Sequence, residues 1–203
     1  MRSWKKWSLL TVAVFLTAAS ARAQIFGPGT SSLFGISATY GSVNDVSHSF
    51  DLSGFKPSEW TVSFDYRIEH TALLRLTYGS MWTEQSLSGQ TVTTPDGPLF
   101  IPSAKEHVNY ITADISYLYS GGFYTGGIFG GIGGYQYKPD PMPPGFEAYQ
   151  DPNQKYFGFN LGLDGEFRVT KIIGIVLRLQ WHYINAHPRR EFFNADAGLV
   201  ARF

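Results

Sequence analysis

The last twelve residues of the chain, 192–203, alternate between two chemically different sets of side chains. One set is apolar and contains Phe193, Ala195, Ala197, Leu199, Ala201 and Phe203. The other set contains Asn194, Asp196, Gly198, Val200 and Arg202. Because successive side chains of a β-strand point to opposite sides, this alternation predicts a strand with one apolar and one polar face.

The same period of two recurs along most of the chain. Together with the last segment it predicts eight strands, at residues 32–43, 60–69, 72–83, 107–119, 123–137, 156–169, 172–184 and 192–203. Most are about 10–14 residues long, whereas strands of soluble proteins usually have about five or six. A tilted strand of this length crosses the apolar core of a thin bilayer.

One of these segments, 123–137, is rich in glycine and changes parity. Tyr124, Ile128 and Ile132 stand at even positions, but Phe129, Tyr135 and Tyr137 stand at odd ones. If all these side chains point outward, an extra residue must interrupt the strand. The sequence therefore predicts a β-bulge among Gly130, Gly131, Gly133 and Gly134.

The connections between the segments alternate in length. Those at 69–71, 120–122 and 170–172 are tight, and the last, 186–190, is also short. Those at 44–59, 84–106 and 138–155 are long and rich in Pro, Gly, Ser and Asp. Short turns on one side and long loops on the other are typical of outer-membrane barrels. We therefore expect an all-β fold, an eight-stranded antiparallel transmembrane up-and-down β-barrel.

The first 23 residues have the composition of a signal peptide. A basic start precedes an apolar run from Leu9 to Ala19 and the cleavage pattern Ala21-Arg22-Ala23. We expect cleavage there, so that residues 24–203 form a single barrel domain. Residues 1–23 hold four of the 16 basic residues and none of the 16 acidic ones, which leaves a net charge of −4. That charge argues against nucleic-acid binding.

The inward faces of the predicted strands carry many charges. They hold Asp65, Arg67, Arg75, Asp114, Asp164, Glu166, Arg168, Arg178, His182, Asp196 and Arg202. The interior of an eight-stranded barrel is just wide enough for side chains to fill, and buried charges must be paired. We therefore predict a charge network that plugs the lumen, with Arg178 close to the acids of its two flanking strands. The alternative is a pore.

From Gln24 to Phe203 the chain resembles the small OmpA/OmpX-type outer-membrane barrels. The resemblance rests on the signal peptide, the eight strands, the terminal Ala201-Arg202-Phe203 and the glycine-rich run 124–131. It implies the outer membrane of a diderm bacterium, with both termini periplasmic and the long loops extracellular. It also implies a lipid bilayer with lipopolysaccharide as surroundings, a monomer, and Phe203 as part of the signal read by the barrel-assembly machinery.

The function predicted from the sequence is non-enzymatic, a structural or adhesion role through loops 44–59, 84–106 and 138–155. One alternative is a narrow channel for small or apolar solutes, as in OmpW-type barrels. A second is a lipid-modifying enzyme, because Trp181-His182-Tyr183-Ile184-Asn185 is similar to the H-x-S-N motif of lipid A deacylase barrels. Ile184 stands at the serine position, however, and His182 is predicted to point inward. We expect no catalytic residue, cofactor or metal site.

Overall fold

The computed structural model describes residues 33–47, 56–69, 71–85, 87–95, 97–121, 123–187 and 189–203. The predicted signal peptide and residues 48–55 of the first long loop lie outside this part of the chain. Within it, no helix is long and apolar enough to span a membrane.

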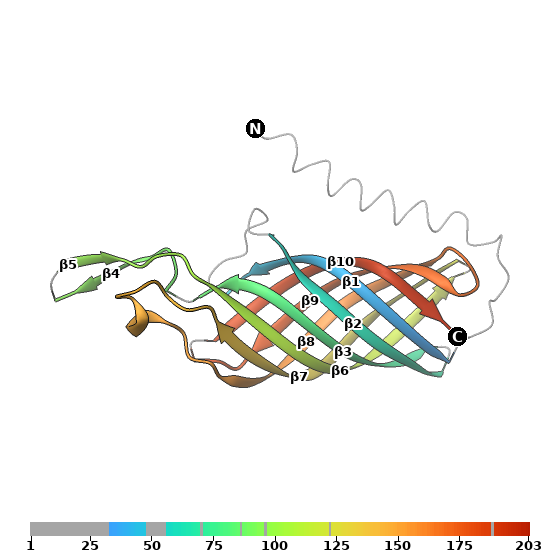
Figure 1. Cartoon of the computed structure of the whole chain (residues 1–203). Helices are drawn as coiled ribbons and strands as arrows, with labels where there is room; N and C mark the ends of the chain where they lie inside the picture. Colours follow the sequence, from blue (N-terminus) through green and yellow to red (C-terminus); the bar gives the residue numbers. More distant parts are fainter. Residues whose placement is uncertain are drawn as a thin grey trace, which may run out of the picture.

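Eight antiparallel strands close into a barrel, as the sequence predicted (Figure 1). They are β1 (Phe34–Asp45), β2 (Lys56–Glu69), β3 (Ala72–Glu84), β6 (Lys105–Gly121), β7 (Tyr124–Pro139), β8 (Lys155–Arg168), β9 (Ile173–Ile184) and β10 (Arg190–Arg202). Each strand pairs with its neighbours in chain order, and β10 pairs with β1. Phe203 and Phe34 exchange two backbone hydrogen bonds of 3.0 Å at this closure. A closed barrel has no open sheet edge to attract another chain.

The third connection, for which the sequence predicts only a long loop, holds two further strands. β4 (Thr91–Thr94) and β5 (Gly97–Phe100) form a separate two-stranded hairpin. Figure 1 shows this hairpin beyond one end of the barrel, opposite the end at which the C-terminus lies. We call these the hairpin end and the Phe203 end. The short 3-10 helix η2 (Glu147–Tyr149) follows in the β7–β8 connection.

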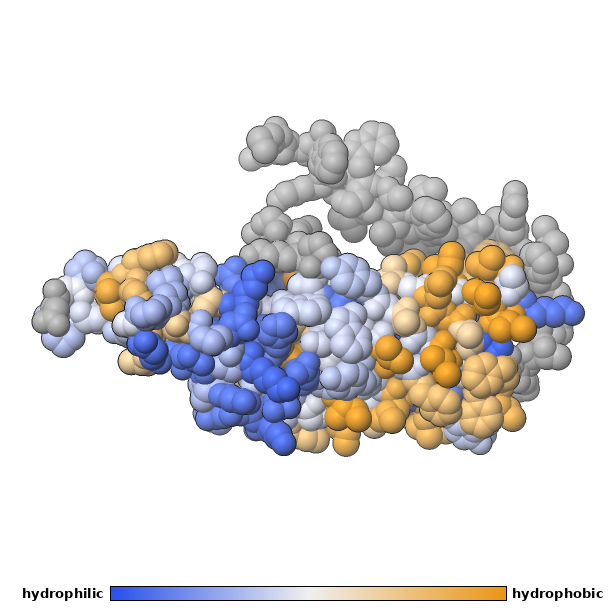
Figure 2. Space-filling model, in the orientation of Figure 1, coloured by the Kyte–Doolittle hydropathy of each residue, from blue (hydrophilic) through white to orange (hydrophobic). Residues whose placement is uncertain are grey.

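The strands separate an apolar outside from a filled inside. Along β9, Ile175, Leu177 and Leu179 are exposed, whereas the alternate residues Val176, Arg178 and Gln180 are buried. Figure 2 shows apolar residues gathered over the half of the barrel nearer the Phe203 end, and hydrophilic residues nearer the hairpin end. This arrangement inverts that of a soluble protein and places the exposed apolar belt against an apolar solvent.

The bulge predicted in β7 was wrong. β7 pairs without interruption with both β6 and β8. Its odd residues point inward throughout, so Phe129, Tyr135 and Tyr137 are buried. Glycines on the next strand make room for the rings: a Cβ on Gly162 would lie 2.4 Å from Phe129. Aromatic residues are therefore part of the lumen filling.

Candidate functional site: the barrel interior and the hairpin end

A chain of alternating charges crosses the lumen near the Phe203 end. Arg75 on β3 contacts Asp65 on β2 and Asp164 on β8, both at 2.7 Å. Arg202 on β10 contacts the second oxygen of Asp65 at 2.9 Å and Glu166 on β8 at 2.7 Å. All five side chains are at least 89% buried, because the most exposed of them, Arg202, has a relative accessibility of 11%. β3 and β8 are not neighbours in the barrel, so Arg75 ties opposite walls together.

The other charges of the predicted network take separate places. Arg67 and Arg168 line a small cavity at the Phe203 end with Glu166 and Arg202. Asp114 accepts a hydrogen bond of 3.1 Å from the Thr112 hydroxyl and is buried, as are Asp196 and His182. The structure thus places the predicted residues inside the barrel but joins only five of them into one chain of ion pairs.

The contact partner of Arg178 differs from the one that strand register alone would predict. It stands directly opposite Asp164 and Asp196 on the flanking strands. Its guanidinium nevertheless donates to the hydroxyl of Ser63 across the lumen, at 3.4 Å. Within the described part of the chain, no carboxylate lies within ion-pair distance of it. The ring of Phe129 lies near both Arg178 and Arg75, with its centroid 6.0 and 5.6 Å from their Cζ atoms.

An aromatic and polar layer follows toward the hairpin end. Glu59 accepts hydrogen bonds from the hydroxyl of Tyr110 and from the amide of Asn194. The hydroxyl of Tyr135 bonds Nδ1 of His182 at 2.8 Å. The rings of Tyr110 and Tyr135 stack with centroids 5.7 Å apart. His182 is fully buried in this layer, away from the lipid-facing surface.

The last layer at the hairpin end is apolar, whereas the sequence predicts a lumen filled by charged side chains. Its buried members are Val43, Met81, Val108, Tyr137, Ile184, Ala186 and Phe192. Arg190 covers it and contacts Glu106 at 2.9 Å and Asp45 at 2.8 Å. A signal for this layer exists in the sequence, because Met81, Val108 and Ile184 stand at inward positions near strand ends.

Two small cavities lie among the described residues of the half nearer the Phe203 end. A cavity beside the Arg75 and Arg202 ion pairs has a volume of about 10 Å³, and so has the one lined by Arg67. Each is about the size of a single water probe. Across the described residues, no three His, Asp or Glu side chains come together as metal ligands.

The loops at the hairpin end are joined by a buried glutamine. Gln85 donates to the backbone oxygens of Lys105, at 3.0 Å, and Asp140, at 2.7 Å. Its own oxygen accepts from the backbone nitrogen of Asp151 at 3.1 Å. Gln85 therefore joins two connections, the β3–β6 connection, which contains β4 and β5, and the β7–β8 connection. Phe100 on the hairpin stays 59% exposed.

No family model and no curated protein sequence matches this chain. Solved structures do match it. Neisserial surface protein A is 14% identical with a TM-score of 0.60, over 85% of this chain and 98% of its own. The outer membrane protein OprG from Pseudomonas aeruginosa is 11% identical with a TM-score of 0.59, over 88% and 99%. A major outer membrane protein from Thermus thermophilus is 10% identical with a TM-score of 0.59, over 86% and 100%.

The chain has the OmpA/OmpX-type barrel fold. At these identities the likeness concerns the fold alone, so the function is argued from the interior and the loops of this chain.

Proposed function

We propose that this chain is a monomeric outer-membrane protein whose lumen is plugged and whose hairpin end binds at the cell surface. The exposed apolar belt supports membrane insertion, and two of the matching structures are of outer-membrane proteins. In the orientation that we propose, the Phe203 end is periplasmic and the β4–β5 hairpin is extracellular. The role is structural or adhesive.

One observation carries this proposal: side chains occupy the lumen in three successive layers. Near the Phe203 end, the ion pairs around Arg75 join opposite walls. The layer of Tyr110 and Tyr135 follows toward the hairpin end. The apolar layer beside Arg190 closes the hairpin end. Side chains that fill the lumen of an eight-stranded barrel interrupt the continuous water that a conducting path needs. Among the described residues, those at the hairpin end remain available for recognition.

The apolar layer also favours a second candidate, a narrow channel for small apolar solutes. Such a solute would have to displace Arg190 from Glu106 and Asp45, and then break the pair of Arg75 with Asp164 across the lumen. A lipid-modifying enzyme is disfavoured, because His182 bonds Tyr135 inside the barrel and Ile184 stands where a serine would be needed.

A deletion strain tests the proposed function against the channel. It is complemented either with the full chain or with a variant in which residues 90–101 are replaced by a short Gly-Ser turn. We expect permeability to small solutes to be equal in all strains. Adherence or serum resistance should fall in the deletion strain and stay low with the hairpin-less variant. Loss of solute uptake in the deletion strain, restored by the hairpin-less variant, would favour the channel.

Membrane insertion predicts a strong penalty for charge on the outward face. Leu177 is 46% exposed in the middle of β9, and Leu177→Arg should cost about 2–4 kcal/mol if it lies near the bilayer midplane. Asn185→Arg, at the exposed residue that directly follows β9 at the hairpin end, should cost about 0–1 kcal/mol. Urea unfolding of both variants in lipid vesicles measures the difference. Equal costs would mean that Leu177 does not face lipid.

Phe203 is expected to matter for assembly more than for the finished barrel. Its side chain is 60% exposed, and the pairing of residues 35–45 with residues 192–202 closes the barrel without Phe203. Deleting Phe203 should lower the amount of membrane-inserted protein in cells, while refolding of the purified chain into detergent changes little. Undiminished insertion in cells would remove Phe203 from the assembly signal.

A further inference from the structure

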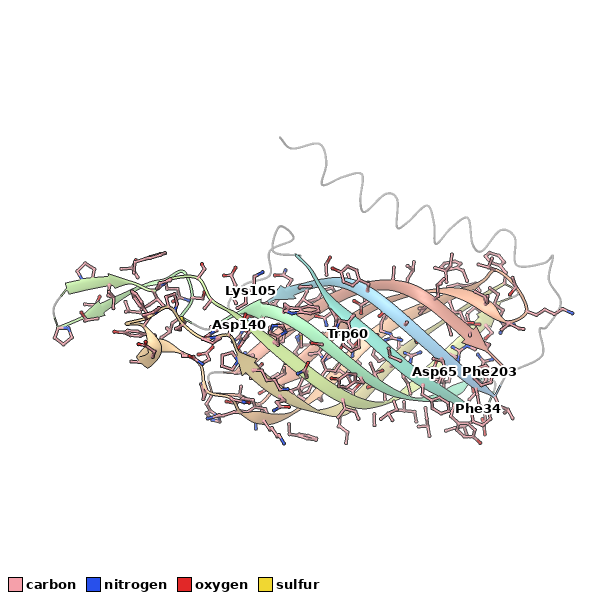
Figure 3. The ribbon with its side chains drawn as sticks, viewed as in Figure 1. Phe34, Trp60, Asp65, Lys105, Asp140 and Phe203 are labelled. Carbon is pink, nitrogen blue, oxygen red and sulfur yellow. The ribbon has the colours of Figure 1, made fainter. Side chains whose placement is uncertain are left out.

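Basic side chains surround the small cavity at the mouth of the Phe203 end. The charged residues that line it are Arg67 on β2, Arg168 and Glu166 on β8, Arg202 on β10 and Lys171 in the β8–β9 turn. These are four positive charges and one negative charge, a net charge of +3. β2 and β8 lie on opposite sides of the barrel, so cations converge here from both walls. Figure 3 labels Asp65 and Phe203 at this end.

Three of these cations have no acidic partner in the protein. Arg202 is engaged, because it pairs with Glu166 and with Asp65. Among the described residues, no carboxylate lies within ion-pair distance of the other three. The only acids outside the described part of the chain, Asp51 and Asp96, belong to connections at the hairpin end. The excess positive charge at this mouth is therefore available to an anion from outside.

Arg67 is the cation in this group that most needs an anion. Its side chain belongs to a residue that is only 6% exposed, and its Nε is buried without a hydrogen-bond partner. Arg202 and Arg168 lie close enough to repel it, and Glu166 and Asp65 offset this only in part, since both already pair with Arg202. A buried guanidinium is costly unless it is paired and hydrogen-bonded. A single water molecule could accept a hydrogen bond from Nε, but it would leave the charge uncompensated.

The size and rim of the cavity show how an anion could approach. Its volume of about 10 Å³ admits one oxygen atom. Thr170 and Lys171 line the cavity and are exposed, so they form its open rim. The hydroxyl oxygen of Thr170 accepts hydrogen bonds from the backbone nitrogens of Ile172 and Ile173, at 3.2 and 2.8 Å. Its own proton is therefore left for another acceptor.

We propose that the mouth of the Phe203 end binds inorganic phosphate or a phosphate monoester. One phosphate oxygen enters the cavity and accepts from Arg67, while Arg168, Lys171 and the Thr170 hydroxyl contact the other oxygens at the rim. Guanidinium groups match the geometry of phosphate oxygens. The net charge of +3 suits a group that carries close to two negative charges at neutral pH. Four donors that surround one ligand suit three or four free oxygens better than the two of a carboxylate or a phosphodiester.

Isothermal titration calorimetry of the purified full chain tests this proposal. The protein is held in dodecyl maltoside, a detergent without phosphate, and titrated near neutral pH with inorganic phosphate and with glycerol phosphate. We expect saturable binding of both. Arg67→Gln should weaken this binding by about 10-fold or more, because a charge-assisted hydrogen bond is lost. Lys155→Gln, at an exposed lysine near the hairpin end, should leave it unchanged.

A second variant keeps the test decisive if the Arg67 variant does not refold. R168Q combined with K171Q removes two cations that have no ion pair to lose, and should weaken phosphate binding about 10-fold. Absence of saturable binding to the wild-type protein would overturn the proposal, as would equal affinity for chloride or unchanged binding by the double variant.

The same titration in phosphatidylcholine nanodiscs distinguishes a free phosphate from a lipid headgroup. Phosphate binding that persists there supports the proposal. Binding seen in detergent but abolished in nanodiscs would overturn the assignment to a free phosphate or monoester, because the phosphodiester of the lipid would then occupy the site. Neither result depends on what the hairpin end does, so the proposed function is tested separately.

Discussion

Arg75→Ala should lower the free energy of unfolding by about 3–5 kcal/mol, the cost typical of breaking a buried ion pair by removing one partner. Arg75 is 3% exposed and bridges Asp65 and Asp164; without it, Asp164 loses its ion pair and Asp65 keeps only the one with Arg202. Because these acids belong to opposite walls, the loss also removes a tie across the lumen. Equilibrium urea unfolding in lipid vesicles measures the change.

Arg168→Ala is the matched control for this experiment. Arg168 is also an arginine of the inner face near the Phe203 end, but it is only half-buried and lies in no ion pair among the described residues. Its replacement should change the unfolding free energy by less than about 1 kcal/mol. If Arg75→Ala lowered the unfolding free energy no more than Arg168→Ala, the chain of ion pairs would contribute little to the stability of the barrel.

Gly131→Val should lower the free energy of unfolding by about 3 kcal/mol or more, because it overpacks a filled interior. A Cβ at this inward position would lie 2.1 Å from Oδ1 of Asp114 and 2.4 Å from the backbone oxygen of Ala113. The carboxylate could move, but the backbone oxygen belongs to the paired strand β6 and could not. The fraction of refolded protein that resists urea, followed by gel mobility without heating, reports the effect.

Gly134→Val provides the comparison on the same strand. Gly134 points outward, and the described residues leave open space around its Cβ position. Valine there should be neutral or stabilising, since it replaces glycine in a strand and meets nothing. If both valine variants lost the same fraction of refolded protein, glycine would be needed for the backbone of β7 and not for room inside the barrel.

The alternation of residues was enough to predict the eight strands, their inward and outward faces, and the closure of the barrel. It failed in β7 because Phe129, Tyr135 and Tyr137 are apolar residues that fill the lumen, and a rule that puts aromatic residues in lipid misplaces them. The inward glycines that face them, such as Gly162, are the signal that could have corrected this.

Contacts across the lumen could not be predicted from the sequence. Strand register gives the neighbours of a residue along the wall, and for Arg178 these are Asp164 and Asp196. Three of the four ion pairs in the chain around Arg75 and Arg202 instead join strands that are not neighbours, as Arg75 does with Asp164. Which residues meet there depends on the shear of the barrel and on the length of each side chain.

Single-channel recording in planar bilayers tests the central claim, that side chains close the lumen from end to end. The account predicts that the wild-type protein inserts without steady conductance, and that Arg75→Ala, which breaks the tie between opposite walls, admits small ions. A steady ohmic conductance from the wild-type protein would contradict the plugged lumen and support a channel.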